Sequence, residues 1–108
     1  MFDCLECAHE IVKLLRGLVA RIAVCDGKLA DQLRRAASSV PLNVAEGRER
    51  GGRDRVFLYR VARGSAAEVV AVLRIARDWG YVEEADVTPA LEALDRVRGM
   101  LWRLTRPR

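Results

Sequence analysis

The sequence predicts a single all-α domain over residues 1–108, folded as an up-down-up-down antiparallel four-helix bundle. Apolar residues recur at three- and four-residue spacing along four segments, which places them on one face of each helix. Short joints rich in glycine or proline separate these segments, and no run alternates apolar and polar residues as a half-buried strand does. Only 6% of the residues are aromatic, so aliphatic side chains build the core, which favours helices over sheets.

The first helix is expected at about residues 3–24 and the second at about 28–48. Cys25-Asp26-Gly27 separates them, and Gly27 is expected to provide a left-handed cap. The first stripe consists of Leu5, Ala8, Val12, Leu15, Val19 and Ile22, and the second of Leu29, Leu33, Ala36, Val40, Val44 and Gly47.

The third helix is expected at about residues 54–79, after the break at Gly51-Gly52 and before Gly80, which ends it. Its apolar stripe is expected to contain Phe57, Val61, Gly64, Glu68, Val72, Ile75 and Trp79. This is the least regular of the four stripes, because a glycine and a glutamate lie inside it.

The fourth helix is expected at about residues 89–105, with Thr88 as its N-cap and Pro89 at the first helical position. Its stripe consists of Leu91, Leu94, Val97, Leu101 and Leu104. Since short joints make consecutive helices antiparallel neighbours, the four helices are expected to form an up-down-up-down bundle.

The formal net charge of +4 hides a bipolar distribution. Residues 48–63 hold six arginines against two acids, and residues 96–108 hold five arginines and no acid. Residues 64–95 carry a net charge of −5. In the predicted bundle the joint between helices two and three lies at the same end as both termini, so one end is expected to be basic and the other acidic. The candidate nucleic-acid-binding residues are Arg48, Arg50, Arg53, Arg55, Arg103, Arg106 and Arg108.

Arginine suits bidentate phosphate contacts, so a basic end indicates binding to RNA or DNA with little sequence readout. Two alternatives remain open: a solvated surface with salt bridges between subunits, and an acidic partner other than nucleic acid. The three arginines of the C-terminal tail are stronger candidates than Arg60 and Arg63, which are expected to pair within or between subunits. Trp102 is placed either to stack on a base or to be buried at an interface.

Polar residues also interrupt the stripes of the second and third helices. Glu68 falls inside the predicted stripe, where a carboxylate has to be paired or hydrogen-bonded, because an unpaired buried charge is very costly. Gly64 allows another backbone to approach closely. We expect a structural polar cluster that joins these two helices and consists of Ser38, Asn43, Glu46, Ser65 and Glu68.

No motif supports catalysis. A di-metal carboxylate site needs two Glu-x-x-His motifs, and His9 is the only histidine of the chain. Cys4 and Cys7 with His9 offer three zinc ligands, but the second half of a zinc motif is missing. Ser65 has no base nearby in the sequence, and the glycine-rich joint follows a helix where a phosphate-binding loop would follow a strand. We therefore predict a protein that is not an enzyme, with no catalytic residue, metal site or cofactor.

The sequence also indicates a cytoplasmic protein. No secretory signal is recognisable, and Lys13, Arg16 and Arg21 interrupt the apolar stretch of the first helix, so no membrane association is expected. Three cysteines in a chain without export features are expected to be reduced thiols.

Two ordered blocks carry a family resemblance. The first is residues 32–47, which read QLRRAASSVPLNVAEG. The second contains Phe57-Leu58, then residues 62–68, which read ARGSAAE, and then Gly80-Tyr81. Together they resemble the bacterial four-helix-bundle family named for proteins encoded in intervening sequences of 23S ribosomal RNA genes. Leu5-Glu6-Cys7 departs from the aromatic residue that members often carry in the first turns.

The resemblance implies a cytosolic bundle that assembles with itself as a ring, typically a homopentamer. One branch, the accessory protein of diversity-generating retroelements, binds nucleic acid and a reverse transcriptase. Cyclic symmetry keeps all subunits parallel, so the basic ends would repeat around one face of a ring. We expect a homo-oligomeric ring that binds RNA or DNA through this face; the alternative is a protein-interaction scaffold that binds no nucleic acid.

Overall fold

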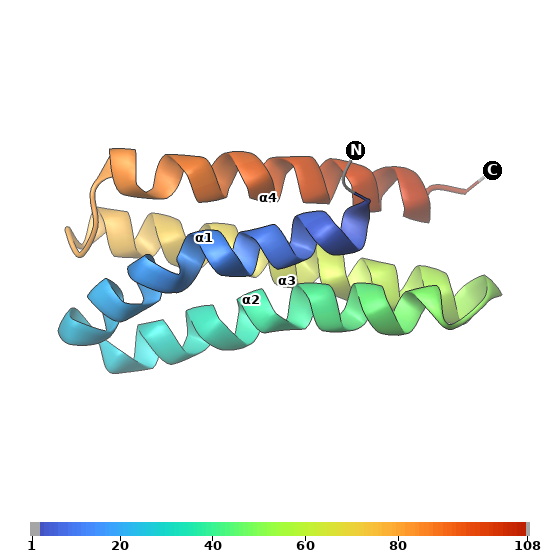
Figure 1. The fold of residues 1–108 in the computed structure, drawn as a ribbon, viewed down its shortest axis with the longest axis horizontal. Coiled ribbons are helices and arrows are strands. Elements are labelled where there is room, and N and C mark those ends of the chain that lie inside the picture. Colours follow the sequence, from blue (N-terminus) through green and yellow to red (C-terminus); the bar gives the residue numbers. More distant parts are fainter. Residues whose placement is uncertain (1–2, 108) are drawn as a thin grey trace.

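The computed structural model describes residues 3–107, and these form a bundle of four antiparallel helices (Figure 1). The helices are α1 (Cys4–Cys25), α2 (Gly27–Arg48), α3 (Gly52–Asp78) and α4 (Glu84–Thr105). Each helix packs beside the next in the chain, and α4 closes the bundle against α1. The bundle measures 43 × 24 × 20 Å along its principal axes. The predicted all-α four-helix fold is therefore confirmed.

One continuous aliphatic core fills the centre of the bundle. Its fully buried large side chains are Ile11, Leu15, Ile22, Leu33, Val40, Val44, Val69, Val72, Leu73, Val87, Leu94 and Leu101. Buried alanines lie between them on every helix, and their small side chains let the helix axes approach closely. None of the helices in the described part of the chain is long and apolar enough to cross a lipid bilayer.

The buried face of α3 differs from the predicted stripe. The side chains that α3 buries are Tyr59, Ala62, Ala66, Val69, Val72, Leu73 and Ala76. Of the predicted stripe only Val72 is buried, and both Phe57 and Trp79 are largely exposed. Glu68 is exposed as well, so its expected burial is wrong for the single chain. The reason is that α3 carries two stripes with helical spacing, and the one rich in alanine and valine allows closer packing against its neighbours.

A single residue, Asp26, joins α1 to α2 and caps both helices. Its backbone N–H donates to the Ile22 carbonyl at 2.7 Å, and its carboxylate accepts from the backbone N–H of Leu29 at 3.0 Å. The Tyr81 hydroxyl donates to the same carboxylate at 3.4 Å. Gly27 is the first residue of α2 and has no positive φ, so its expected role as a left-handed cap is wrong. The extended backbone of Asp26, with φ of −158°, makes the turn instead.

Gly80 ends α3 as predicted. Its φ of 81° lies in the left-handed region that favours glycine. The backbone N–H of Tyr81 donates to the Ala76 carbonyl at 2.9 Å, and that of Gly80 donates to the Arg77 carbonyl at 2.9 Å. These two bonds define a Schellman motif, which satisfies the last carbonyls of the helix.

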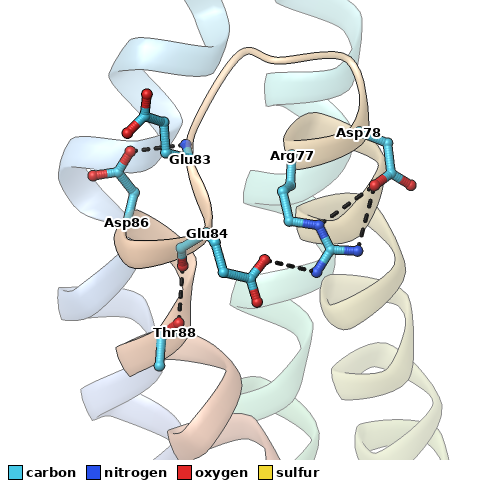
Figure 2. Close-up of polar contacts among 6 residues, drawn as sticks. All are labelled: Arg77, Asp78, Glu83, Glu84, Asp86 and Thr88. Carbon is cyan, nitrogen blue, oxygen red and sulfur yellow. Dashed lines mark hydrogen bonds and ion pairs between the residues drawn. The ribbon is translucent and has the colours of Figure 1, made fainter.

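The fourth helix begins at Glu84, five residues before the predicted start (Figure 2). The backbone N–H of Glu83 donates to the Asp86 carboxylate at 2.9 Å, which is one half of a capping box. Thr88 is therefore not the N-cap, and its hydroxyl donates to the Glu84 carbonyl at 2.8 Å. Pro89 lies in the second turn, where it removes a single ladder bond.

Two arginines, one on α3 and one on α1, form ion pairs with the first turn of α4. Arg77 of α3 donates to the Glu84 carboxylate of α4 at 3.0 Å and also contacts Asp78 (Figure 2). Arg21 of α1 pairs with Asp86 at 3.1 Å. The hydrogen bond from Arg21 lowers the pKa of Asp86 below its ordinary value, and the hydrogen bond from the Glu83 backbone contributes a smaller decrease.

We predict that Asp26→Ala lowers the free energy of unfolding by about 1 kcal/mol, because the variant cannot cap α2. Urea denaturation followed by circular dichroism measures the change. Tyr81→Phe is the matched control, since it removes only the hydroxyl contact and leaves the cap in place. A variant Asp26→Ala as stable as the wild type would contradict the capping role.

We predict that Gly47→Ala destabilises the fold by about 1–3 kcal/mol through overpacking. A Cβ at the buried Gly47 would lie 2.6 and 2.8 Å from the ring atoms Cε1 and Cδ1 of Tyr59, which is itself buried. Gly64→Ala is the control on the exposed face of α3, where an added Cβ meets no atom within 4 Å. It should stabilise the separate chain by about 0.5–1 kcal/mol, as alanine does in a helix interior. If Gly47→Ala and Gly64→Ala change the melting temperature equally, the Tyr59 ring does not prevent a side chain at position 47.

Candidate nucleic-acid interface

The fold brings the two arginine-rich segments to one end of the bundle. The joint between α2 and α3 lies at the same end as the start of α1 and the end of α4 (Figure 1). The joints α1–α2 and α3–α4 lie at the opposite end, together with the acidic caps of α2 and α4. The bipolar charge pattern of the sequence therefore becomes a basic end and an acidic end in space.

Two of the predicted arginines are paired within the chain. Arg48 lies 3.2 Å from the Asp3 carboxylate. Arg50 lies 3.0 Å from Glu46 and 3.6 Å from Asp54. All five side chains are exposed, so these pairs contribute little to stability, but they offset part of the local positive charge.

Arg55 has a structural role. Its Nε donates to the Gly47 carbonyl and its Nη2 donates to the Arg48 carbonyl, both at 3.2 Å. These are among the last carbonyls of α2, which have no partner inside the helix. Arg55 therefore closes the C-terminus of α2 from the first turn of α3.

Arg53 and Arg103 are exposed, and neither forms an ion pair with any acid in the described part of the chain. The same holds for Arg60 and Arg98, which the sequence does not single out as nucleic-acid contacts. Arg108 lies outside the described residues. The unneutralised positive charge of the basic end thus lies on the first half of α3 and the second half of α4.

Two guanidinium groups lie close to the Trp102 ring. The Cζ of Arg63, on α3, lies 5.1 Å from the ring centroid, and that of Arg106 lies 5.5 Å from it. Arg63 pairs with no acid among the described residues, so of the expected pairing within or between subunits the part within the chain is not found. The sequence signal for the second contact is the four-residue spacing from Trp102 to Arg106, the residue that directly follows α4.

The structure brings together only part of the predicted polar cluster. The Oγ atoms of Ser39 and Ser65 lie 2.7 Å apart and link α2 to α3. The Asn43 side-chain amide donates to the Ser39 carbonyl at 2.8 Å and to its hydroxyl at 2.9 Å. Ser38 is half-buried beside this group, but it makes no hydrogen bond within the described chain. Ser39, which the prediction left out, takes its place because it is the residue four before Asn43.

The two predicted glutamates lie apart from the Ser39–Ser65 pair. Glu68 accepts a hydrogen bond from the Gln32 side chain of α2 at 3.3 Å. Glu46 accepts from Arg50 at 3.0 Å on the surface. The seam between α2 and α3 therefore carries separate polar contacts along its length, and Gln32 is a further contributor that the sequence pattern did not reveal.

No group of three or more metal-ligating side chains is found between residues 3 and 107. His9 is exposed, whereas Cys4 and Cys7 are half-buried in the first turn of α1. Burial raises the pKa of the Cys4 thiol to about 11, with Cys7 and Asp3 adding smaller contributions. A thiol with this pKa stays protonated at neutral pH, which makes it a weak nucleophile and a poor metal ligand.

These observations define the class of protein: a small helical bundle with an arginine-rich end. The model of the 23S rRNA-intervening sequence protein family matches residues 3–103, so the chain belongs to that family. This confirms the resemblance carried by the two sequence blocks.

The chain is also similar to a solved structure from Bacteroides thetaiotaomicron VPI-5482, a protein of unknown function from the S23 ribosomal protein family. The TM-score is 0.85, and the match covers 97% of this chain and 100% of that one. The sequences are 16% identical, so this likeness shows the fold alone. No curated protein matches the sequence.

We predict that Cys4 reacts slowly with a maleimide at pH 8 and faster as the pH rises toward 11, by about tenfold per pH unit, because only the thiolate reacts. The measurement uses the double variant Cys7→Ser with Cys25→Ser. The control is Cys4→Ser with Cys7→Ser, which leaves only the exposed Cys25. Labelling of Cys4 at pH 8 as fast as that of Cys25 would contradict the raised pKa.

Proposed function

We propose that this protein is a non-catalytic nucleic-acid-binding protein that acts as a homo-oligomeric ring, with the basic ends of its subunits on one face. The observation that carries the proposal is the excess of arginines over carboxylates at one end of the bundle, where Arg53 and Arg103 form no ion pair with a described acid. Such a surface attracts phosphates through counterion release, with little dependence on base sequence.

Arg53 gives particular support to a functional origin of this charge. It lies in the first turn of α3, where the helix dipole disfavours positive charge. Arg55 lies in the same turn, but its own unfavourable position is offset by its hydrogen bond to the Gly47 carbonyl at the end of α2. Arg53 forms no ion pair or hydrogen bond with another described residue, so its charge contributes no visible stabilisation to the fold.

The exposed apolar side chains of α2 and α3 support assembly of the chain with itself. Leu42 is 68% exposed, Phe57 64% and Trp79 71%, and the last two belong to the second stripe of α3. Exposed apolar stripes of this kind typically mark protein–protein interfaces. Gly64 lies on the same stripe with open space in front of it, which permits a neighbouring helix to approach. The family resemblance implies five copies, and cyclic symmetry would place all basic ends on one side.

The same stripe favours the second candidate function, a protein-interaction scaffold. Its apolar residues would then receive a different protein, and the basic end would be a solvated surface. The two candidates differ in one property, which is salt-sensitive binding of polyanions.

We predict that labelled RNA and DNA oligonucleotides bind the protein in fluorescence-anisotropy titrations and that the affinity falls steeply between low and physiological salt. The double variant Arg53→Gln with Arg103→Gln should bind more weakly. Its salt slope for a single strand should be smaller by about 0.7 for each phosphate that the substituted arginines no longer neutralise. The matched control is Lys28→Gln with Arg74→Gln, which removes the same charge away from the basic end.

Absence of binding at low salt would overturn the nucleic-acid proposal and favour the scaffold. Equally weakened binding by the two double variants would show that net charge, and not the basic end, drives binding. Sedimentation equilibrium on the same samples gives the number of copies, and a monomer at the concentrations that bind would contradict the ring.

A further inference from the structure

An open groove lies between α3 and α4 at the basic end. It has a volume of about 480 Å³ and is lined by Arg63, Asp95, Arg98, Gly99 and Trp102. The lining therefore contains one carboxylate and two guanidinium groups, and Arg106 adds a third guanidinium at the Trp102 ring. The groove has an excess of positive charge and one aromatic wall.

The exposure of Trp102 is not explained by packing within the chain. Its side chain is 52% exposed, although the indole is among the largest apolar groups available to a core. Two arginines cover part of the ring, and neither is held there by a described carboxylate. Trp79 is also exposed, but it lies at the acidic end, and no described arginine stacks on its ring.

Gly99 leaves room for another molecule in this groove. Glycine in a helix interior is less favourable than alanine, and Gly99 lies within α4. An added Cβ would meet only the Nη1 atom of Arg103, at 3.8 Å, so no neighbour in the chain requires a glycine here. The missing side chain leaves space beside Trp102 for the close approach of a ligand.

We infer that this groove binds an unpaired nucleobase, which stacks on Trp102 while Arg63, Arg98 and Arg106 contact the neighbouring phosphates. The inference rests on the proposed function and names its ligand as single-stranded nucleic acid. Binding replaces a guanidinium on the indole by a base and transfers that guanidinium to a phosphate. Base stacking and a charge-assisted hydrogen bond are both stronger than an exposed cation–π contact, so the exchange is favourable.

The geometry selects single strands over duplex. In a duplex each base is stacked on both faces by its neighbours, whereas an unpaired base offers a free face to an aromatic side chain. Every base has such a face, so the site reads little sequence. Duplex nucleic acid would contact only the arginines.

The test uses the two tryptophans of the chain as separate reporters. In Trp79→Phe, Trp102 is the only tryptophan, and a single-stranded oligonucleotide should quench its fluorescence while a blunt duplex of equal length should not. In Trp102→Phe, the remaining Trp79 at the acidic end should show no quenching with either. Trp102→Ala should weaken single-strand binding by about tenfold or more, with an unchanged salt slope because no charge is removed.

The outcomes separate this inference from the proposed function. Base stacking would be overturned if single strand and duplex bind with equal affinity, Trp102 fluorescence is not quenched and Trp102→Ala binds fully. The protein would then be a ring that contacts only the phosphate backbone of nucleic acid. No binding of either nucleic acid would overturn both. Circular dichroism of Trp102→Ala checks that the helices are intact, and Trp102→Phe, which keeps an aromatic ring, should retain more affinity than Trp102→Ala if stacking holds the base.

Discussion

The close packing of α2 against α3 is the constraint on which the rest of the structure depends. Gly47 has no side chain, and the ring of Tyr59 fills the space where one would stand. Further along the seam, Ala62 and Ala66 are fully buried, and the hydroxyls of Ser39 and Ser65 meet at 2.7 Å. Only small side chains allow this approach, so the alanine-rich face of α3 turns inward. The larger apolar residues of α3 are left outside as a consequence, and they form the second stripe.

The separation of charge follows partly from helix capping. The N-termini of α2 and α4 lie at one end, where Asp26 and Asp86 accept hydrogen bonds from backbone N–H groups. The C-terminus of α2 lies at the other end, where Arg55 donates to its last carbonyls. Acids at helix N-termini and bases at C-termini both complement the helix dipoles. Helix capping thus explains some of the charges of each sign. It does not explain the unpaired arginines around Trp102.

The sequence predicted the number of helices, their order and the glycine that ends α3, because these depend on local spacing and local backbone conformation. It did not predict which stripe of α3 is buried, since both have helical spacing and only packing against α2 and α4 decides between them. Thr88 and Pro89 formed a stronger local signal than Glu83, yet the capping contacts of Asp86 place the start of α4 earlier. At the candidate site, composition located the basic end. Contacts between helices, such as that of Arg63 with Trp102, depend on the relative rotation of α3 and α4, which the sequence pattern does not contain.

The one-residue joint at Asp26 has a consequence for how this fold tolerates changes in length. Each residue of a helix turns the chain by about 100°, because an α-helix has 3.6 residues per turn. With a single residue between α1 and α2, there is no loop in which an inserted or deleted residue could be absorbed. A one-residue insertion there would turn α2 about its own axis, so that Leu33 and Val44 would move to the exposed positions that Arg34 and Ala45 now hold. The α1–α2 corner therefore sets the rotation of α2 about its own axis, whereas the α2–α3 and α3–α4 joints contain more residues outside helices and can absorb a change in length.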